Sequence, residues 1–122
     1  MNHVKIFSFL FLACSFLGKA QDINQAKKAI DAEQFDAAKK ILKTALQLKP
    51  GNGKAMFLLG NVYIKQNQED SAKVIFSKGL LAPEMARFNY IGLGQLDLNS
   101  NNLTAAQANF ALATKDLKKK DL

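Results

Sequence analysis

Hydrophobic and polar positions divide the chain into an apolar first segment and a longer part with helical periodicity. In the longer part, Ile41, Ala45 and Leu48 show the spacing of one helix face. No stretch alternates with the period of two that a half-buried strand requires, so the pattern predicts no sheet. The apolar runs and the polar turns between them predict six helices, at about 22–33, 36–48, 53–66, 70–82, 86–98 and 104–117.

The predicted helices form an internal repeat. Shifting the sequence by 34 residues aligns small residues with small ones and large with large. The aligned columns are Ala26/Gly60/Gly94, Ala38/Ala72/Ala106, Ala45/Gly79/Ala113 and Leu42/Phe76/Phe110. Small residues allow close approach of antiparallel helices, so Gly60 is expected against Ala72 and, one repeat later, Gly94 against Ala106. The repeats run over about 19–52, 53–86 and 87–120.

The middle repeat carries Leu59, Gly60 and Tyr63, followed by Ala72 and Phe76. At these spacings it resembles the tetratricopeptide repeat family, and the resemblance covers essentially all of residues 21–122. The resemblance implies an all-α fold, a right-handed helical-repeat solenoid of about three helix-turn-helix repeats. It also implies that the domain binds other proteins and is not an enzyme.

The third repeat departs from this pattern. Asp97 stands in the Tyr63 column, so the first helix of this repeat lacks an aromatic anchor. Gly92 adds a second helical glycine beside Gly94, and an interior glycine costs about 1 kcal/mol relative to alanine. We therefore expect the third repeat to be the least stable.

Residues 1–20 have the layout of a secretory signal peptide. Lys5 precedes an apolar run over 6–17, and Gly18 and Ala20 frame a cleavage site that leaves Gln21 as the mature start. The run is too short to span a hydrocarbon core of about 30 Å. We therefore predict export to a periplasmic or extracellular location, with no membrane span in the mature chain. A buried N-terminal core helix is the alternative.

Cys14 is the single cysteine of the chain. A lipoprotein pattern would place an acylated cysteine there: Ala13 fits that pattern and Phe11 does not. Lipid anchoring at Cys14 is therefore the lesser alternative to cleavage after Ala20. Cleavage would remove both Cys14 and His3, which are the only cysteine and histidine.

Without those two side chains the mature chain has no Cys–His or Ser–His nucleophile system and no histidine or cysteine metal site. The glycines at Gly92 and Gly94 lie inside a predicted helix and so do not form a phosphate loop. Loss of Lys5 and Lys19 lowers the net charge from +7 to about +5, and the remaining lysines are mostly scattered. We predict no catalysis, no cofactor, no metal and no nucleic-acid partner.

The resemblance also implies a concave groove lined by the first helix of each repeat. The candidate partner-binding residues are Lys27, Lys54, Phe57, Asn61, Ile64, Lys65, Phe88, Ile91, Gln95 and Leu98, with Ile23 and Ile30 beside them. The same apolar side chains could instead pack between adjacent first helices. The carboxylate clamp of some cochaperone repeats is not expected, because only Lys27 among the corresponding residues could serve it. The other positions hold Ile23, Leu58, Phe88 and Gly92.

The predicted function is thus an exported scaffold that binds a peptide or helical segment of another protein in its groove. Two alternatives remain. The chain could be the N-terminal part of a longer array that acts as a spacer or assembly platform, or a non-catalytic domain of a larger exported enzyme. Because the third repeat has no predicted capping helix, we also expect open apolar surface around Phe110, Leu112 and Leu117, and self-association or fraying there.

Overall fold

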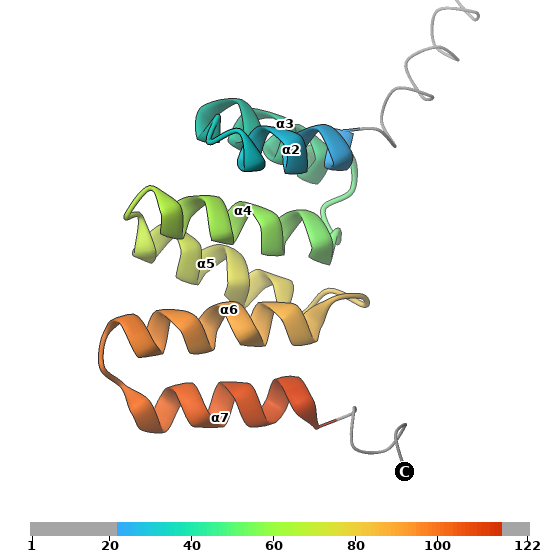
Figure 1. The fold of residues 1–122 in the computed structure, drawn as a ribbon. Coiled ribbons are helices and arrows are strands. Elements are labelled where there is room, and N and C mark those ends of the chain that lie inside the picture. The colour runs from blue at the N-terminus through green and yellow to red at the C-terminus, as the bar shows by residue number, and fades with distance from the viewer. Residues whose placement is uncertain (1–21, 116–122) are drawn as a thin grey trace, which may run out of the picture.

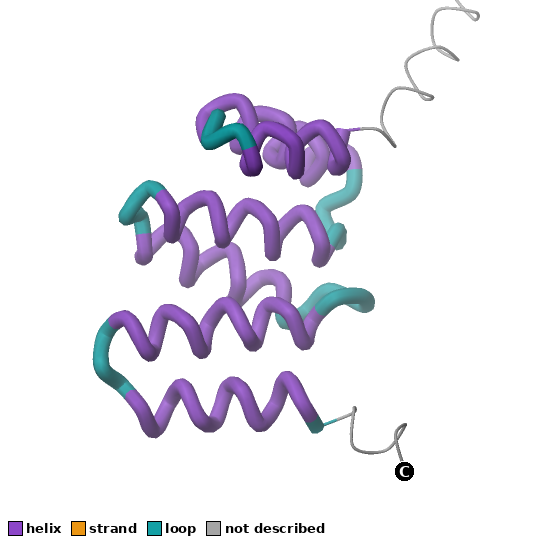
Figure 2. The backbone as a smooth tube through the Cα atoms, viewed as in Figure 1, coloured by secondary structure: helices purple, strands orange, loops and turns teal. Residues whose placement is uncertain are grey.

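The computed structural model describes residues 22–115, which fold into six helices paired into three hairpins stacked along one axis (Figures 1 and 2). The helices are α2 (Asp22–Asp31), α3 (Phe35–Leu48), α4 (Gly53–Lys65), α5 (Glu69–Gly79), α6 (Ala86–Asn99) and α7 (Leu103–Thr114). Residues 22–115 contain no strand. The predicted six helices and all-α repeat fold are therefore confirmed. The predicted signal peptide, including Cys14, and Leu117 lie outside the described residues.

Two helix ends differ from the prediction by three residues, and the other bounds agree within two. The helix expected to reach residue 82 ends at Gly79, before Pro83. Its last amides bond three residues back instead of four: Leu81 donates to Lys78 and Ala82 to Gly79. These tighter turns end the α-helix early. The last helix ends at Thr114 instead of 117. None of the helices within 22–115 has both the length and the apolar character that crossing a membrane requires.

The turn inside each repeat has one shape, repeated every 34 residues. Glu33, Asn67 and Asn101 adopt left-handed φ angles of 58°, 57° and 59°. The residue after each of these three donates its backbone amide to the carbonyl of the residue five positions earlier in the sequence. The donor–acceptor distance is 2.8 Å in all three turns. This arrangement satisfies the free carbonyls at a helix end and requires one left-handed residue. Asparagine tolerates that conformation well, whereas glutamate does not.

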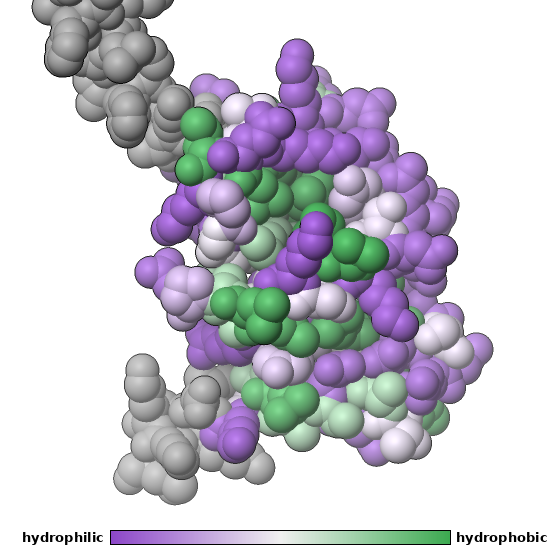
Figure 3. Space-filling view, turned by 180° about the vertical axis from the view of Figure 1, so that it is seen from behind, coloured by the Kyte–Doolittle hydropathy of each residue, from purple (hydrophilic) through white to green (hydrophobic). Residues whose placement is uncertain are grey.

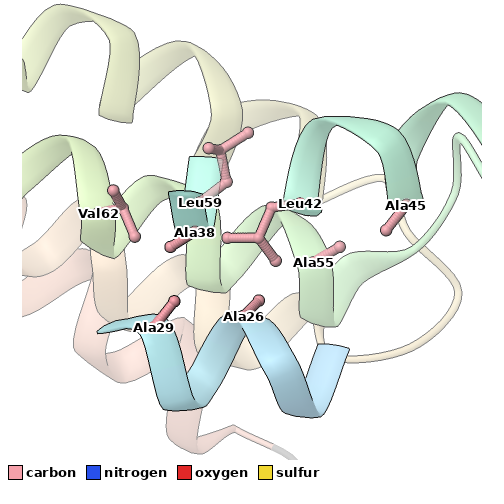
Figure 4. Close-up of a cluster of buried hydrophobic side chains, with 8 residues drawn as sticks. All are labelled: Ala26, Ala29, Ala38, Leu42, Ala45, Ala55, Leu59 and Val62. Atoms are coloured by element: carbon pink, nitrogen blue, oxygen red, sulfur yellow. The ribbon is translucent and has the colours of Figure 1, made fainter. Parts of the chain in front are cut away.

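A cluster of small buried side chains holds the first three helices together (Figure 4). Its members are Ala26, Ala29, Ala38, Leu42, Ala45, Ala55, Leu59 and Val62. Five of these residues are alanines, which allow the helix backbones to approach closely. A second cluster, of Ala72, Phe76 and Leu96, joins α5 to α6, with Phe57, Ile64 and Leu93 packed against it.

The glycine columns face aromatic rings. The nearest atoms to a Cβ built on Gly60 belong to Phe76, at 2.3 Å, and those nearest a Cβ on Gly94 belong to Phe110, at 2.5 Å. The expected partners, Ala72 and Ala106, are therefore not the closest neighbours. A side chain at either position would overlap the phenylalanine ring of the following helix, so only glycine fits there.

Polar side chains join the end of one helix to the start of the helix before it. The Gln66 amide donates to Asp36 at 3.3 Å, and the Asn99 amide donates to Glu69 at 2.9 Å. Asp36 also forms an ion pair with Lys39 at 3.0 Å. The hydrogen bond from Lys39, and then that from Gln66, lower the pKa of Asp36 below its ordinary value. These contacts are exposed and so add little to stability.

Candidate functional site

The first helices of the three repeats lie side by side. α4 packs against both α2 and α6, and in Figure 1 these three helices are nearer the viewer than α3 and α5. Every predicted partner-binding residue lies on α2, α4 or α6. The fold therefore gathers these residues into one layer.

An aromatic pair joins two of these helices. The ring centroids of Phe57 in α4 and Phe88 in α6 lie 5.5 Å apart, with the rings tilted by 56°. Phe57 also lies 6.3 Å from the ring of Phe76. The Arg87 guanidinium stands 4.9 Å from the Phe88 ring centroid, within the range of a cation–π contact. Both rings are half-buried, so the pair packs between helices and still presents part of its surface.

The other predicted residues differ in exposure. Lys54, Asn61 and Ile64 of α4 are half-buried, and Ile64 packs against the second cluster. Lys27, Lys65 and Gln95 are exposed. Ile23 and Ile30 pack partly against the first cluster. Phe57 and Phe88 thus pack between helices, Ile64 packs against the second cluster, and the Gln95 amide donates to Asn99 at 3.1 Å. Which of these residues meet a partner stays a prediction.

Ile91 and Leu98 are the most exposed apolar residues of the predicted set, at 42% and 39%. One repeat earlier the same columns hold Phe57 and Ile64, which pack against the second cluster. The difference follows from position: α4 has α6 beside it, whereas α6 has no further helix on that side within 22–115.

The residues at the clamp positions are used for packing. Leu58 packs against the first cluster. A Cβ built on Gly92 would lie 2.4 Å from Phe76. Leucine and glycine side chains offer no hydrogen-bond donor to a ligand carboxylate, and the absence of a clamp stays a prediction.

Asn89 is a buried polar residue that the sequence analysis missed. Its side chain is fully buried, and its amide donates to the carbonyls of Gly53, at 3.3 Å, and Met85, at 3.1 Å. A Cβ built on Gly79 would overlap the Asn89 side chain. Asn89 therefore ties the start of α4 and the 80–85 linker to α6. The sequence signal that could have identified Asn89 is its place in the 34-residue repeat, because the corresponding residue of the preceding repeat is the apolar Ala55.

The sequence analysis also missed a hydrogen-bonded pair of polar residues at positions that are apolar or aromatic in the preceding repeat. The Asn109 amide donates to Asp97 at 2.7 Å, where the preceding repeat has Ile75 and Tyr63. Beside this pair is an open cavity of about 320 Å³, lined by Glu69, Asp70, Lys73, Ser77, Leu93, Leu96, Asp97, Ser100 and Asn109. The hydrogen bond accounts for an Asp in the tyrosine column. Across residues 22–115, no three carboxylate, cysteine or histidine side chains are grouped so as to hold a metal ion.

The tetratricopeptide repeat family model matches residues 29–89, half of the chain. The repeated hairpins, the small-residue columns and this match agree, and the chain belongs to the tetratricopeptide repeat family. Tetratricopeptide repeats in general mediate protein–protein interaction and are non-catalytic modules. A search of curated proteins found no match.

Proposed function

We propose that this chain is an exported adaptor that binds a peptide or helical segment of another protein across α2, α4 and α6. The two alternatives, a spacer in a longer array and a non-catalytic domain of a larger exported enzyme, use the same fold. They do not require a ligand on this layer of helices, which makes ligand binding there the point to test.

The observation that carries the proposal is the half-exposed pair of Phe57 and Phe88 with Asn61 on the same side of α4. Aromatic anchors in partly desolvated positions supply much of the binding energy at protein interfaces. The Asn61 amide has no hydrogen-bond partner among residues 22–115 and can pair with the backbone of a bound segment. Together these groups offer an apolar contact and a polar one within a single turn of α4.

Charge favours an acidic partner segment. The three charged residues of the predicted set, Lys27, Lys54 and Lys65, are all basic, and the chain after the predicted cleavage carries a net charge of about +5. Basic side chains beside an apolar contact attract acidic peptides and speed their association. Binding should therefore weaken as salt increases, because exposed charges are screened over about 10 Å at 0.1 M ionic strength.

The proposal is tested by panning a displayed random-peptide library on the chain and measuring the affinity of the selected peptides. We expect acidic sequences whose binding falls roughly tenfold, about 1.4 kcal/mol, in Asn61→Ala and in Lys54→Glu. Lys40→Glu, an exposed lysine on α3, is the matched control for charge reversal. Peptides that bind equally well to Lys54→Glu and lose binding in Lys40→Glu would place the site elsewhere.

Export is tested separately, by intact-mass analysis of the protein from its natural host. A mature chain that begins at Gln21 is expected. A mass that retains residues 1–20 would contradict export by this signal. An acyl chain on Cys14 would replace the soluble exported form by a lipid-anchored one.

A further inference from the structure

Phe76 and Phe110 occupy the same column but have different surroundings. The Phe76 ring is fully buried, because Gly60 of α4 faces it from one side and Gly92 of α6 from the other. The Phe110 ring covers Gly94 of α6 in the same way but is only half-buried. Among the described helices, α7 makes extensive contact with α6 alone. Among residues 22–115, no further helix covers the far side of Phe110 as α6 covers Phe76.

Three more exposed apolar side chains lie on α6 and α7. Ile91 and Leu98 of α6 are 42% and 39% exposed, and Leu103 of α7 is 64% exposed. Leu103 and Phe110 are seven residues apart, close to two helical turns, so they lie on the same side of α7. We call Ile91, Leu98, Leu103 and Phe110 the C-terminal face. In the interior of the stack, the residues of the Ile91, Leu98 and Phe110 columns are covered by the next repeat.

Three of the four residues of the C-terminal face lie in an uncharged stretch of a basic chain. No charged residue occurs between Leu98 and Thr114, although the whole chain carries 17 lysines and arginines and 10 acidic residues. In the space-filling view, green and pale-green surface is also visible at the level of α7, at the lower end of the molecule (Figure 3). Two positively charged copies can approach through this region without placing like charges opposite each other.

The opposite end of the stack does not complement this face. Leu58, Leu59 and Val62 of α4 pack against the repeat before them. The corresponding positions of α2 hold Asn24, Gln25 and Lys28, all of which are exposed. A head-to-tail contact would bury Lys28 against leucine and phenylalanine side chains with no partner for its charge, at a large desolvation cost. The polar α2 surface therefore acts as a cap, and it disfavours open-ended stacking.

We propose that a second copy of this chain covers the C-terminal face, so that two molecules pair through α6 and α7 about a two-fold axis. Such an interface is self-complementary, because each copy contributes the same apolar patch. The pairing closes at two molecules, since the other end of each is polar. This proposal is independent of partner binding on the layer of first helices, although Ile91 and Leu98 border both surfaces.

The test is analytical ultracentrifugation of the full chain, with processing checked by mass, from low to high micromolar concentration. The wild type should be a monomer–dimer system with no larger species. Leu103→Glu should raise the dimer dissociation constant by about tenfold or more, because it places a charge in each half of the interface. Leu112→Glu is the matched control, since Leu112 is 46% exposed and lies half a turn around α7 from Leu103.

A second control, Val74→Glu, alters an exposed apolar residue of α5 outside the face. Melting temperatures of all variants separate loss of pairing from loss of folding. A wild type that stays monomeric at every concentration would overturn the proposal. So would equal weakening by Leu103→Glu and Leu112→Glu, or an open series of larger oligomers, which would indicate head-to-tail contact. Failure of peptide binding with pairing intact, or the reverse, would separate this proposal from the adaptor function.

Discussion

The ring of Phe76 in α5 lies where a side chain on Gly92 in α6 would have to be. An ideal Cβ on Gly92 would stand 2.4 Å from Phe76 Cε1, well inside van der Waals contact. Phe76 is at the same time fully buried against Gly60 from the other side. The two glycines therefore form a slot for one ring, and the slot joins the second repeat to the third.

Gly92→Ala should destabilise the protein despite alanine's higher helix propensity. Propensity alone would add about 1 kcal/mol of stability, but overpacking of a filled core costs about 1–3 kcal/mol. Urea unfolding measures the net change, which we expect to be a loss. Gly51→Ala is the control, because a Cβ there has no neighbour within 4 Å. Partial recovery in the double variant Gly92→Ala/Phe76→Leu would identify the ring as the cause, and a stabilised Gly92→Ala would refute the slot.

Phe76→Ala and Phe110→Ala should differ in cost. The sequence treats the two as equivalent, but Phe76 is fully buried and Phe110 is half-buried. Removal of a buried phenylalanine costs about 3–5 kcal/mol, and the loss at Phe110 should be smaller because folding removes less of its apolar surface from water. Thermal or urea unfolding at low protein concentration, where pairing is absent, provides the comparison. Equal costs at the two sites would mean that Phe110 is covered in the monomer.

Asn89→Ala should destabilise the junction between α4 and α6. The substitution leaves the carbonyls of Gly53 and Met85 without the amide that now bonds them. Each lost hydrogen bond costs about 0.5–1.5 kcal/mol, and the Met85 carbonyl keeps its bond from the Phe88 amide. Asn24→Ala, at an exposed position of α2, should have little effect by comparison. Hydrogen exchange should show faster opening at the start of α4 in Asn89→Ala, and unchanged protection there would contradict the assigned role.

Glu33→Gly should stabilise the first repeat. Glu33 has a φ of 58°, a left-handed conformation that costs an ordinary L-residue about 1–2 kcal/mol and glycine very little. After allowance for glycine's greater freedom in the unfolded chain, a net gain of up to about 1 kcal/mol is expected. Gln34→Gly is the control, since Gln34 has a φ of −85°, and it should give no gain. The melting temperature decides between the two outcomes.

The helices, the repeat and the turns could be predicted from the sequence because each depends on residues close together in the chain. Asn67 and Asn101 mark left-handed turns by their own conformational preference. The 34-residue spacing also located Ala38, Ala72 and Ala106, all of which are buried. The family resemblance selected the partner-binding residues, and their role in binding stays a prediction.

Contacts between repeats were decided by the tertiary structure. Periodicity identified Gly60 as a close-packing position, but only the packed helices show that Phe76, and not Ala72, is its nearest neighbour. In the sequence, Asn89 is only a polar residue of a predicted helix. Its burial follows from the packing of the 80–85 linker and Gly53 around it in the folded structure. Phe57 and Ile91 share a column and differ in exposure because, within residues 22–115, Phe57 has the next first helix beside it and Ile91 does not. Local pattern determines which face of a helix is apolar, whereas burial of that face depends on neighbours that are distant in the chain.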